Sequence, residues 1–160
     1  MNLTQKEKML LKDQQSHEEL CIKKYNNYSN QAQDPQLKQM FQGLAQQEQQ
    51  HLNTINQIMS GQVPNTNSQQ QQQGGQQQGQ QMQQGANQNQ SSGNQNKKDA
   101  ELCQDMLTTE KYISSTYNTA IFEFGNHNVR DALNHIQKEE QQHGESIFNY
   151  MQSNGMYQTQ

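Results

Sequence analysis

The chain has 160 residues, of which 28% are hydrophobic, and a formal net charge of −4 at pH 7. The charge is mild and the basic residues are scattered, which leaves no electrostatic footprint for nucleic acid, and an anionic membrane is not an expected partner either. Residues 1–12 contain four charged side chains and no long apolar run, so we expect neither a secretory signal nor a membrane span. The expectation is therefore synthesis and folding in a cytoplasm.

The first predicted element is a helical hairpin over residues 3–60. Asp34 is a good helix N-cap, and Pro35 after it is favoured at the first position of a helix. This pair therefore ends one helix and begins the next. We predict one helix from about Thr4 to Gln31 and a second from Pro35 to Ser60.

The second predicted element is a linker over residues 61–97. It consists almost entirely of Gln, Asn, Gly and Ser, and it shows no apolar periodicity. Such a segment cannot bury enough apolar surface to offset the entropy lost on ordering. We predict a long disordered, Gln-rich crossover, and we expect the segments on either side of it to form one domain.

The third predicted element is another helical hairpin, over residues 98–153. Gly125 and Asn126 lie at the turn equivalent to that of Asp34 in the first hairpin, and we interpret them as a C-cap glycine and a capping asparagine. We predict helices from Lys98 to Phe124 and from Asn128 to Ser153.

The two hairpins align without a gap when residues 6–59 are shifted onto 98–151, an offset of 92 residues. Matches include Leu10 with Leu102, Tyr25 with Tyr117, and Ile55 with Ile147. Two hairpins can bury their apolar faces against each other. The sequence therefore predicts an all-α, ferritin-like four-helix bundle made of two duplicated helical hairpins.

The motif that suggests a chemical function is Glu-x-x-His, which occurs twice in equivalent positions. Each copy follows another glutamate at the same distance, and the six residues are Glu18, Glu48, His51, Glu110, Glu140 and His143. Helical periodicity places all six on apolar stripes that face inward. The stripes contain Leu11, Cys21, Tyr25, Phe41, Leu44, Ile55, Cys103, Met106, Leu107, Ile113, Tyr117, Leu133, Ile136 and Ile147.

These six residues are a complete ligand set for a two-metal carboxylate site. Four carboxylates and two neutral imidazoles balance two divalent cations, and one Glu from each of two helices plus Glu-x-x-His from the other two occurs in di-iron and di-manganese bundles. Carboxylate and imidazole ligands suit iron or manganese, although zinc can use the same atoms. The alternative is a relic site, in which these groups bond to one another or to water.

Other polar residues near the motifs receive simpler interpretations. We expect Glu19, Glu139 and Glu145 on solvated faces, and His17 and His135 at the surface. Asp13 and Asp105 are either partners of the histidine ring nitrogens or surface caps and ion pairs. Tyr25 and Tyr117 are expected to pack in the core with a hydroxyl hydrogen bond, and Cys21 and Cys103 to be free, buried thiols.

Residues 10–28 and 36–59, followed by Asp105, Glu110, Tyr117 and the segment from Glu140 to His143, resemble the spore coat F (CotF-like) family of endospore-forming bacteria. The resemblance covers both hairpins and excludes the Gln-rich segment. It implies a ferritin-like fold and a place in the protein coat of the spore, after synthesis in the mother cell. It also implies other spore coat proteins as partners and leaves homo-oligomerisation open.

Two functions are compatible with these observations. The preferred one is a structural component of the endospore coat whose bundle retains the two-metal site as a latent or accessory activity, which favours a structural protein over an enzyme. The alternative is a di-metal oxidoreductase that acts on peroxide and resembles manganese catalase or a rubrerythrin-type peroxidase. The absence of a second electron-carrier domain favours the catalase-like version of this alternative.

Overall fold

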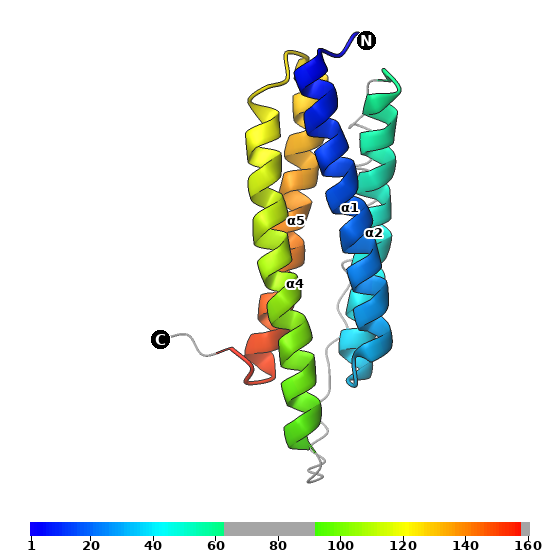
Figure 1. Ribbon diagram of the computed structural model, residues 1–160. Coiled ribbons are helices and arrows are strands. Elements are labelled where there is room, and N and C mark those ends of the chain that lie inside the picture. The colour runs from blue at the N-terminus through cyan, green and yellow to red at the C-terminus, as the bar shows by residue number, and fades with distance from the viewer. Residues whose placement is uncertain (63–91, 158–160) are drawn as a thin grey trace, which may run out of the picture.

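The computed structural model of the protein describes residues 1–62 and 92–157, with side chains from Lys97 onward in the second segment. Over these residues the chain forms helices and no strand: α1 (Gln5–Gln31), α2 (Pro35–Met59), α4 (Ser92–Ile121) and α5 (His127–Ser153). Figure 1 shows the four lying side by side as one elongated bundle. The predicted all-α four-helix architecture is confirmed.

The helices form two antiparallel pairs, α1 with α2 and α4 with α5 (Figure 1). Helix α1 also contacts α4, and α2 contacts α5. Helix α2 ends at one end of the bundle, and α4 begins at the other end (Figure 1).

The predicted disordered linker lies mostly outside the described residues, which resume at Ser92. Its last part, 92–97, belongs to α4, so the predicted helix start at Lys98 was too late. Extending an existing helix requires no new nucleation, and a polar segment of low helix propensity can therefore continue it.

Side-chain caps begin three of the helices. Thr4 and Glu7 form a capping box at the start of α1, where the Glu7 amide donates to Thr4 Oγ1 at 3.2 Å and the Thr4 amide donates to Glu7 Oε2 at 2.7 Å. Asp34 caps α2 ahead of Pro35, and Asn126 caps α5. The capping roles predicted for Asp34 and Asn126 are confirmed.

The predicted role of Gly125 was wrong. Helix α4 already ends at Ile121, and the backbone leaves it through a turn at Phe122 and Glu123. Gly125 has no positive φ, so it does not provide the left-handed C-cap that glycine usually supplies. Its amide instead donates to Glu7 Oε1 at 3.1 Å, which ties the turn between α4 and α5 to the start of α1.

The turn of the first hairpin is held in the same way. Asp99, on α4, is 92 residues after Glu7 and accepts hydrogen bonds from the amides of Gln33 and Asp34, both at 2.9 Å. A buried acid near the start of each hairpin therefore accepts hydrogen bonds from backbone amides in the turn of the other hairpin.

The core consists of the stripes that periodicity predicts. Every apolar residue of the predicted stripes is buried, and Tyr25 and Tyr117 are fully inaccessible. Cys21 and Cys103 are buried free thiols, as expected. This packing leaves the glutamates and histidines of the same stripes facing one another in the middle of the bundle.

Candidate metal centre

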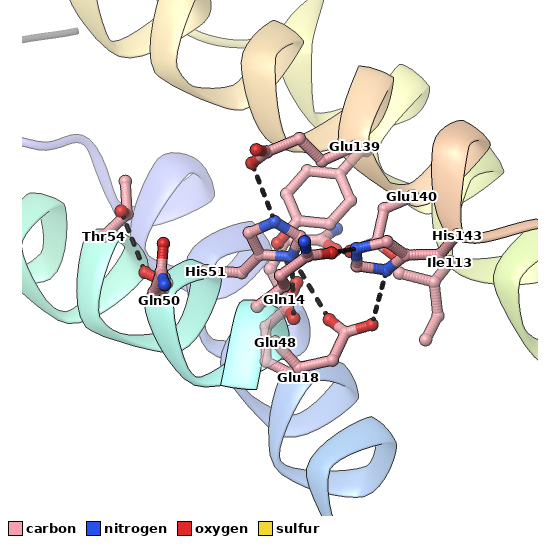
Figure 2. Close-up of polar contacts among 12 residues, drawn as sticks. Gln14, Glu18, Glu48, Gln50, His51, Thr54, Ile113, Glu139, Glu140 and His143 are labelled. Atoms are coloured by element: carbon pink, nitrogen blue, oxygen red, sulfur yellow. Dashed lines mark hydrogen bonds and ion pairs between the residues drawn. The ribbon is translucent and has the colours of Figure 1, made fainter. Parts of the chain in front are cut away.

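All six predicted ligands meet inside the bundle. Each of the four helices contributes, and none of these residues is more than 2% exposed. They come from α1 (Glu18), α2 (Glu48 and His51), α4 (Glu110) and α5 (Glu140 and His143). Figure 2 shows Glu18, Glu48, His51, Glu140 and His143 pointing toward one another.

The six residues form two overlapping clusters. One consists of Glu18, Glu48, His51 and Glu140, and the other consists of Glu48, Glu110, Glu140 and His143. In each cluster the candidate ligand atoms lie within 4.8 Å of one another. Glu48 and Glu140 belong to both clusters, so each of these carboxylates is placed between two candidate cation positions.

Both histidines direct Nδ1 at the shared carboxylates (Figure 2). His51 Nδ1 lies 3.2 Å from Glu48 Oε2 and 3.1 Å from Glu140 Oε1. His143 Nδ1 lies 3.0 Å from Glu48 Oε1 and 3.7 Å from Glu140 Oε2. The two imidazole rings stack with centroids 5.5 Å apart. The atoms that would bind a cation are therefore the two Nδ1 atoms and the carboxylate oxygens around them.

The outer nitrogen of each histidine contacts a residue of the opposite hairpin. His51 Nε2 lies 3.0 Å from Glu139 Oε2, and His143 Nε2 lies 2.6 Å from the amide oxygen of Gln47. Glu139 and Gln47 are related by the same 92-residue offset as the ligands. Because both contacted atoms are acceptors, they favour the tautomer in which Nε2 carries the hydrogen and Nδ1 keeps its lone pair.

One prediction about the surroundings was wrong, and one choice between alternatives that the sequence left open is now decided. Glu139 does not lie on a solvated face, because its side chain is only 14% exposed and contacts His51. Asp105 is not a partner of the histidines. It accepts hydrogen bonds from the Tyr28 hydroxyl at 2.6 Å and pairs with Lys24 at 2.6 Å near the surface. The alternative of a surface ion pair therefore holds for Asp105.

Of the remaining polar neighbours, the glutamates lie at the surface as expected, whereas the two histidines are more buried than expected. The side chains of Glu19, Glu145 and Asp13 are exposed. His17 and His135 are half-buried and belong to neither ligand cluster among the described residues. His135 contacts Glu139 at 3.4 Å.

The two core tyrosines bond to the carboxylates that the clusters do not share. The Tyr25 hydroxyl donates to Glu110 Oε1, and the Tyr117 hydroxyl donates to Glu18 Oε1. Each tyrosine reaches across to the glutamate of the other hairpin. These contacts confirm the predicted hydroxyl hydrogen bonds and hold one oxygen of each terminal carboxylate in place.

Three buried carboxylate oxygens make no hydrogen bond with the described residues. They are Glu18 Oε2, Glu110 Oε2 and Glu140 Oε2. A buried carboxylate oxygen without a donor is costly. All three belong to the ligand clusters, so the unsatisfied acceptors lie where a cation would bind.

In the absence of a cation, burial favours the protonated, neutral form of the four carboxyl groups. It raises the pKa of Glu18 and the pKa of Glu140 to about 7. It also raises the pKa of Glu48, and it raises that of Glu110 well above the ordinary value. Desolvation of the charged form is the largest cause in every case.

The two histidines differ in their affinity for a proton. Burial lowers the pKa of His143 to about 4. Burial also opposes protonation of His51, but its contacts with Glu139 and the cluster carboxylates outweigh this effect and raise its pKa well above the ordinary value. The difference follows the outer partners, since Glu139 is an acid and Gln47 is a neutral amide.

The donor set fits a pair of divalent cations. Lone pairs on Nδ1 and on carboxylate oxygens face one another, and such a cluster is stable only with protons or cations between its members. Two divalent ions neutralise four carboxylates, and the oxygen and imidazole donors suit iron or manganese. Glu48 and Glu140 would contact both ions, and the other four residues would each contact one.

No curated protein and no solved structure matches the chain. One protein family does, and its model covers the second hairpin, including Glu110, Glu140 and His143, but not the first. The resemblance of the first hairpin stays a prediction. Residues 98–160 match the model of the Coat F domain, and this similarity supports a relation to the spore coat F family.

Proposed function

We propose that this protein is a structural component of the bacterial endospore coat, and that two divalent cations at the buried centre link its hairpins. The similarity of residues 98–160 to the Coat F domain carries the coat role. On this proposal the bundle is ferritin-like and arose by duplication, the chain is made in the mother cell, and its partners are other coat proteins.

The position of the centre suits a structural role for the cations. Each cluster combines residues of the first hairpin with residues of the second. A cation in either position would therefore bond to both hairpins and oppose their separation. No described helix combines the length and hydrophobicity that crossing a membrane requires, and the proposal needs no such helix.

Metal content is the first test of this proposal. The purified chain is supplied with iron and manganese, freed of loose ions and measured by inductively coupled plasma mass spectrometry. We expect two ions per chain from the two clusters. The matched pair is Glu140→Gln, which removes a shared ligand, and Glu145→Gln, which changes an exposed glutamate of the same helix. A folded wild type without metal would make the six residues a relic site.

The alternative function, oxidation–reduction of peroxide, is favoured by one feature. Glu48 and Glu140 are shared between the clusters, and two close metal ions can exchange electrons with a small oxidant. In disproportionation, two molecules of hydrogen peroxide give two of water and one of dioxygen, so no further reductant is required. Oxygen release by the metal-loaded wild type, lost in Glu48→Gln, would support this function. Full metal occupancy without oxygen release would refute the catalase-like version of this function.

A further inference from the structure

The candidate ligands are nearly inaccessible, so a cation needs a path to reach them. A pocket of about 490 Å³ between α4 and α5 borders the centre. Its lining includes Leu107, Glu110, Lys111, Glu140, Gly144 and Glu145. Two of these residues, Glu110 and Glu140, are candidate ligands. The pocket therefore reaches from the surface to two side chains of the cluster that also contains His143.

Gly144 keeps space open at this point. A Cβ atom at this position would lie 3.7 Å from Leu107 Cδ1 and 3.9 Å from Glu110 Cβ, which is ordinary contact. The rest of a larger side chain would extend into the space that the pocket occupies. The first hairpin has Leu52 at the equivalent position, directly after His51, and this side chain is half-buried. The two sides of the centre therefore differ in bulk at this position.

The charges around the pocket suit a cation. Three acidic residues, Glu110, Glu140 and Glu145, line it together with one basic residue, Lys111. Glu110 Oε2 and Glu140 Oε2 are buried and make no hydrogen bond with the described residues. Behind the lining, an arriving cation would therefore find carboxylate oxygens that lack other donors.

We propose that this pocket is the path by which divalent cations reach the centre, and that they arrive first at the position of Glu110 and His143. The inference rests on the proposed metal centre. The second ion position is then filled through the shared carboxylates, Glu48 and Glu140. A small side chain at position 144 keeps the path open and so affects the rate of uptake, while the candidate ligands determine how much metal is held at equilibrium.

The test measures the rate of Mn²⁺ uptake by the metal-depleted full chain, from the loss of the free-ion electron paramagnetic resonance signal. We expect Gly144→Leu to slow uptake by about tenfold or more, which corresponds to a barrier higher by roughly 1.4 kcal/mol. Gly144→Ala should remain near the wild-type rate, because the added Cβ makes only ordinary contacts. Gly43→Leu is the matched control, since Gly43 lies on an exposed part of α2 with nothing near its Cβ position.

A charge reversal provides an independent variant that leaves the pocket open. Glu145→Lys should slow uptake, and the effect should shrink as salt screens the charge. Glu101→Lys changes the net charge equally at an exposed site of α4 outside the pocket lining, and it should have a smaller effect.

The outcomes separate the path from the centre itself. Full stoichiometry in wild type and Gly144→Leu, with equal uptake rates, would refute the path and leave the centre intact. Slow uptake with unchanged final stoichiometry supports it. If the wild type binds no metal, the centre and the path both fail. Circular dichroism and final stoichiometry identify a variant that is slow because it is misfolded.

Discussion

At the scale of single residues, the surroundings of the candidate ligands differ between the two hairpins. The six candidate ligands match across the two hairpins, but the outer partner of His51 is the carboxylate of Glu139, whereas that of His143 is the amide of Gln47. A carboxylate that accepts from a ligating imidazole makes the imidazole a stronger donor. The two cation positions should therefore differ in affinity.

Substitution of Glu139 and Gln47, which contact the Nε2 atoms of the two histidines, tests this asymmetry. We expect wild type to bind two Mn²⁺ ions in two steps, and Glu139→Gln to weaken the tighter step by about tenfold, since outer partners typically contribute 10–100-fold. Gln47→Glu should strengthen the weaker step. Isothermal titration calorimetry measures both steps, with Glu145→Gln as the exposed control. Equal affinities in wild type would contradict the expected asymmetry.

At the scale of helices, buried acids connect the two hairpins at their turns. Glu7 completes the capping box of α1 and also accepts from the Gly125 amide between α4 and α5. Burial alone would raise its pKa, but the hydrogen bonds from Thr4 and Gly125 outweigh burial and lower it. The ionised form of Glu7 is therefore the one that stabilises the fold.

The sign of this shift predicts a pH dependence. A lowered pKa in the folded state gives a contribution that is present above the ordinary value of 4.5 and is lost as pH falls through the folded value. We expect Glu7→Gln to reduce the free energy of unfolding by about 1 kcal/mol at neutral pH. The difference from wild type should diminish below the folded pKa.

Urea unfolding at neutral and acidic pH measures this difference. Glu19→Gln, at an exposed position of the same helix, should leave the free energy of unfolding nearly unchanged at both pH values. An equal loss for Glu7→Gln at both pH values would show that the charge of Glu7 is not the source of its stabilising effect.

At the scale of the whole molecule, the proposed cations should stabilise the bundle, because they bind only when both hairpins are in place. A ligand at a hundred times its Kd adds about 2.7 kcal/mol per site. Two filled sites should therefore raise Tm by roughly 10 °C or more for a domain of this size. Thermal unfolding with and without a chelator measures the shift.

A double variant provides the control for this thermal shift. Glu48→Gln combined with Glu140→Gln removes both shared carboxylates and should make Tm insensitive to metal. Gln keeps the size of the side chains, and it also removes two buried acids, so the metal-free variant should still fold. A metal-dependent Tm in this variant would place the stabilising ions elsewhere.

Local patterns were enough to predict the four helices in outline and the inward orientation of the candidate ligands. Helical periodicity decides which residues of a helix face inward, and it correctly places Glu18, Glu48, Glu110 and Glu140 with their histidines in the core. The caps at Asp34 and Asn126 depend only on neighbouring residues. The repeat of these patterns at one offset then indicates a shared level along the bundle.

Only the tertiary structure decided what lies across from each of these residues. Glu139 contacts His51, Gly125 donates to Glu7, and a pocket opens at Gly144, all through packing between segments far apart in the sequence. Periodicity within one helix carries no information about the side chains of the helix packed against it. The sequence by itself therefore determined the inward-facing ligand set, and the packing of the hairpins determined its outer partners and its access to solvent.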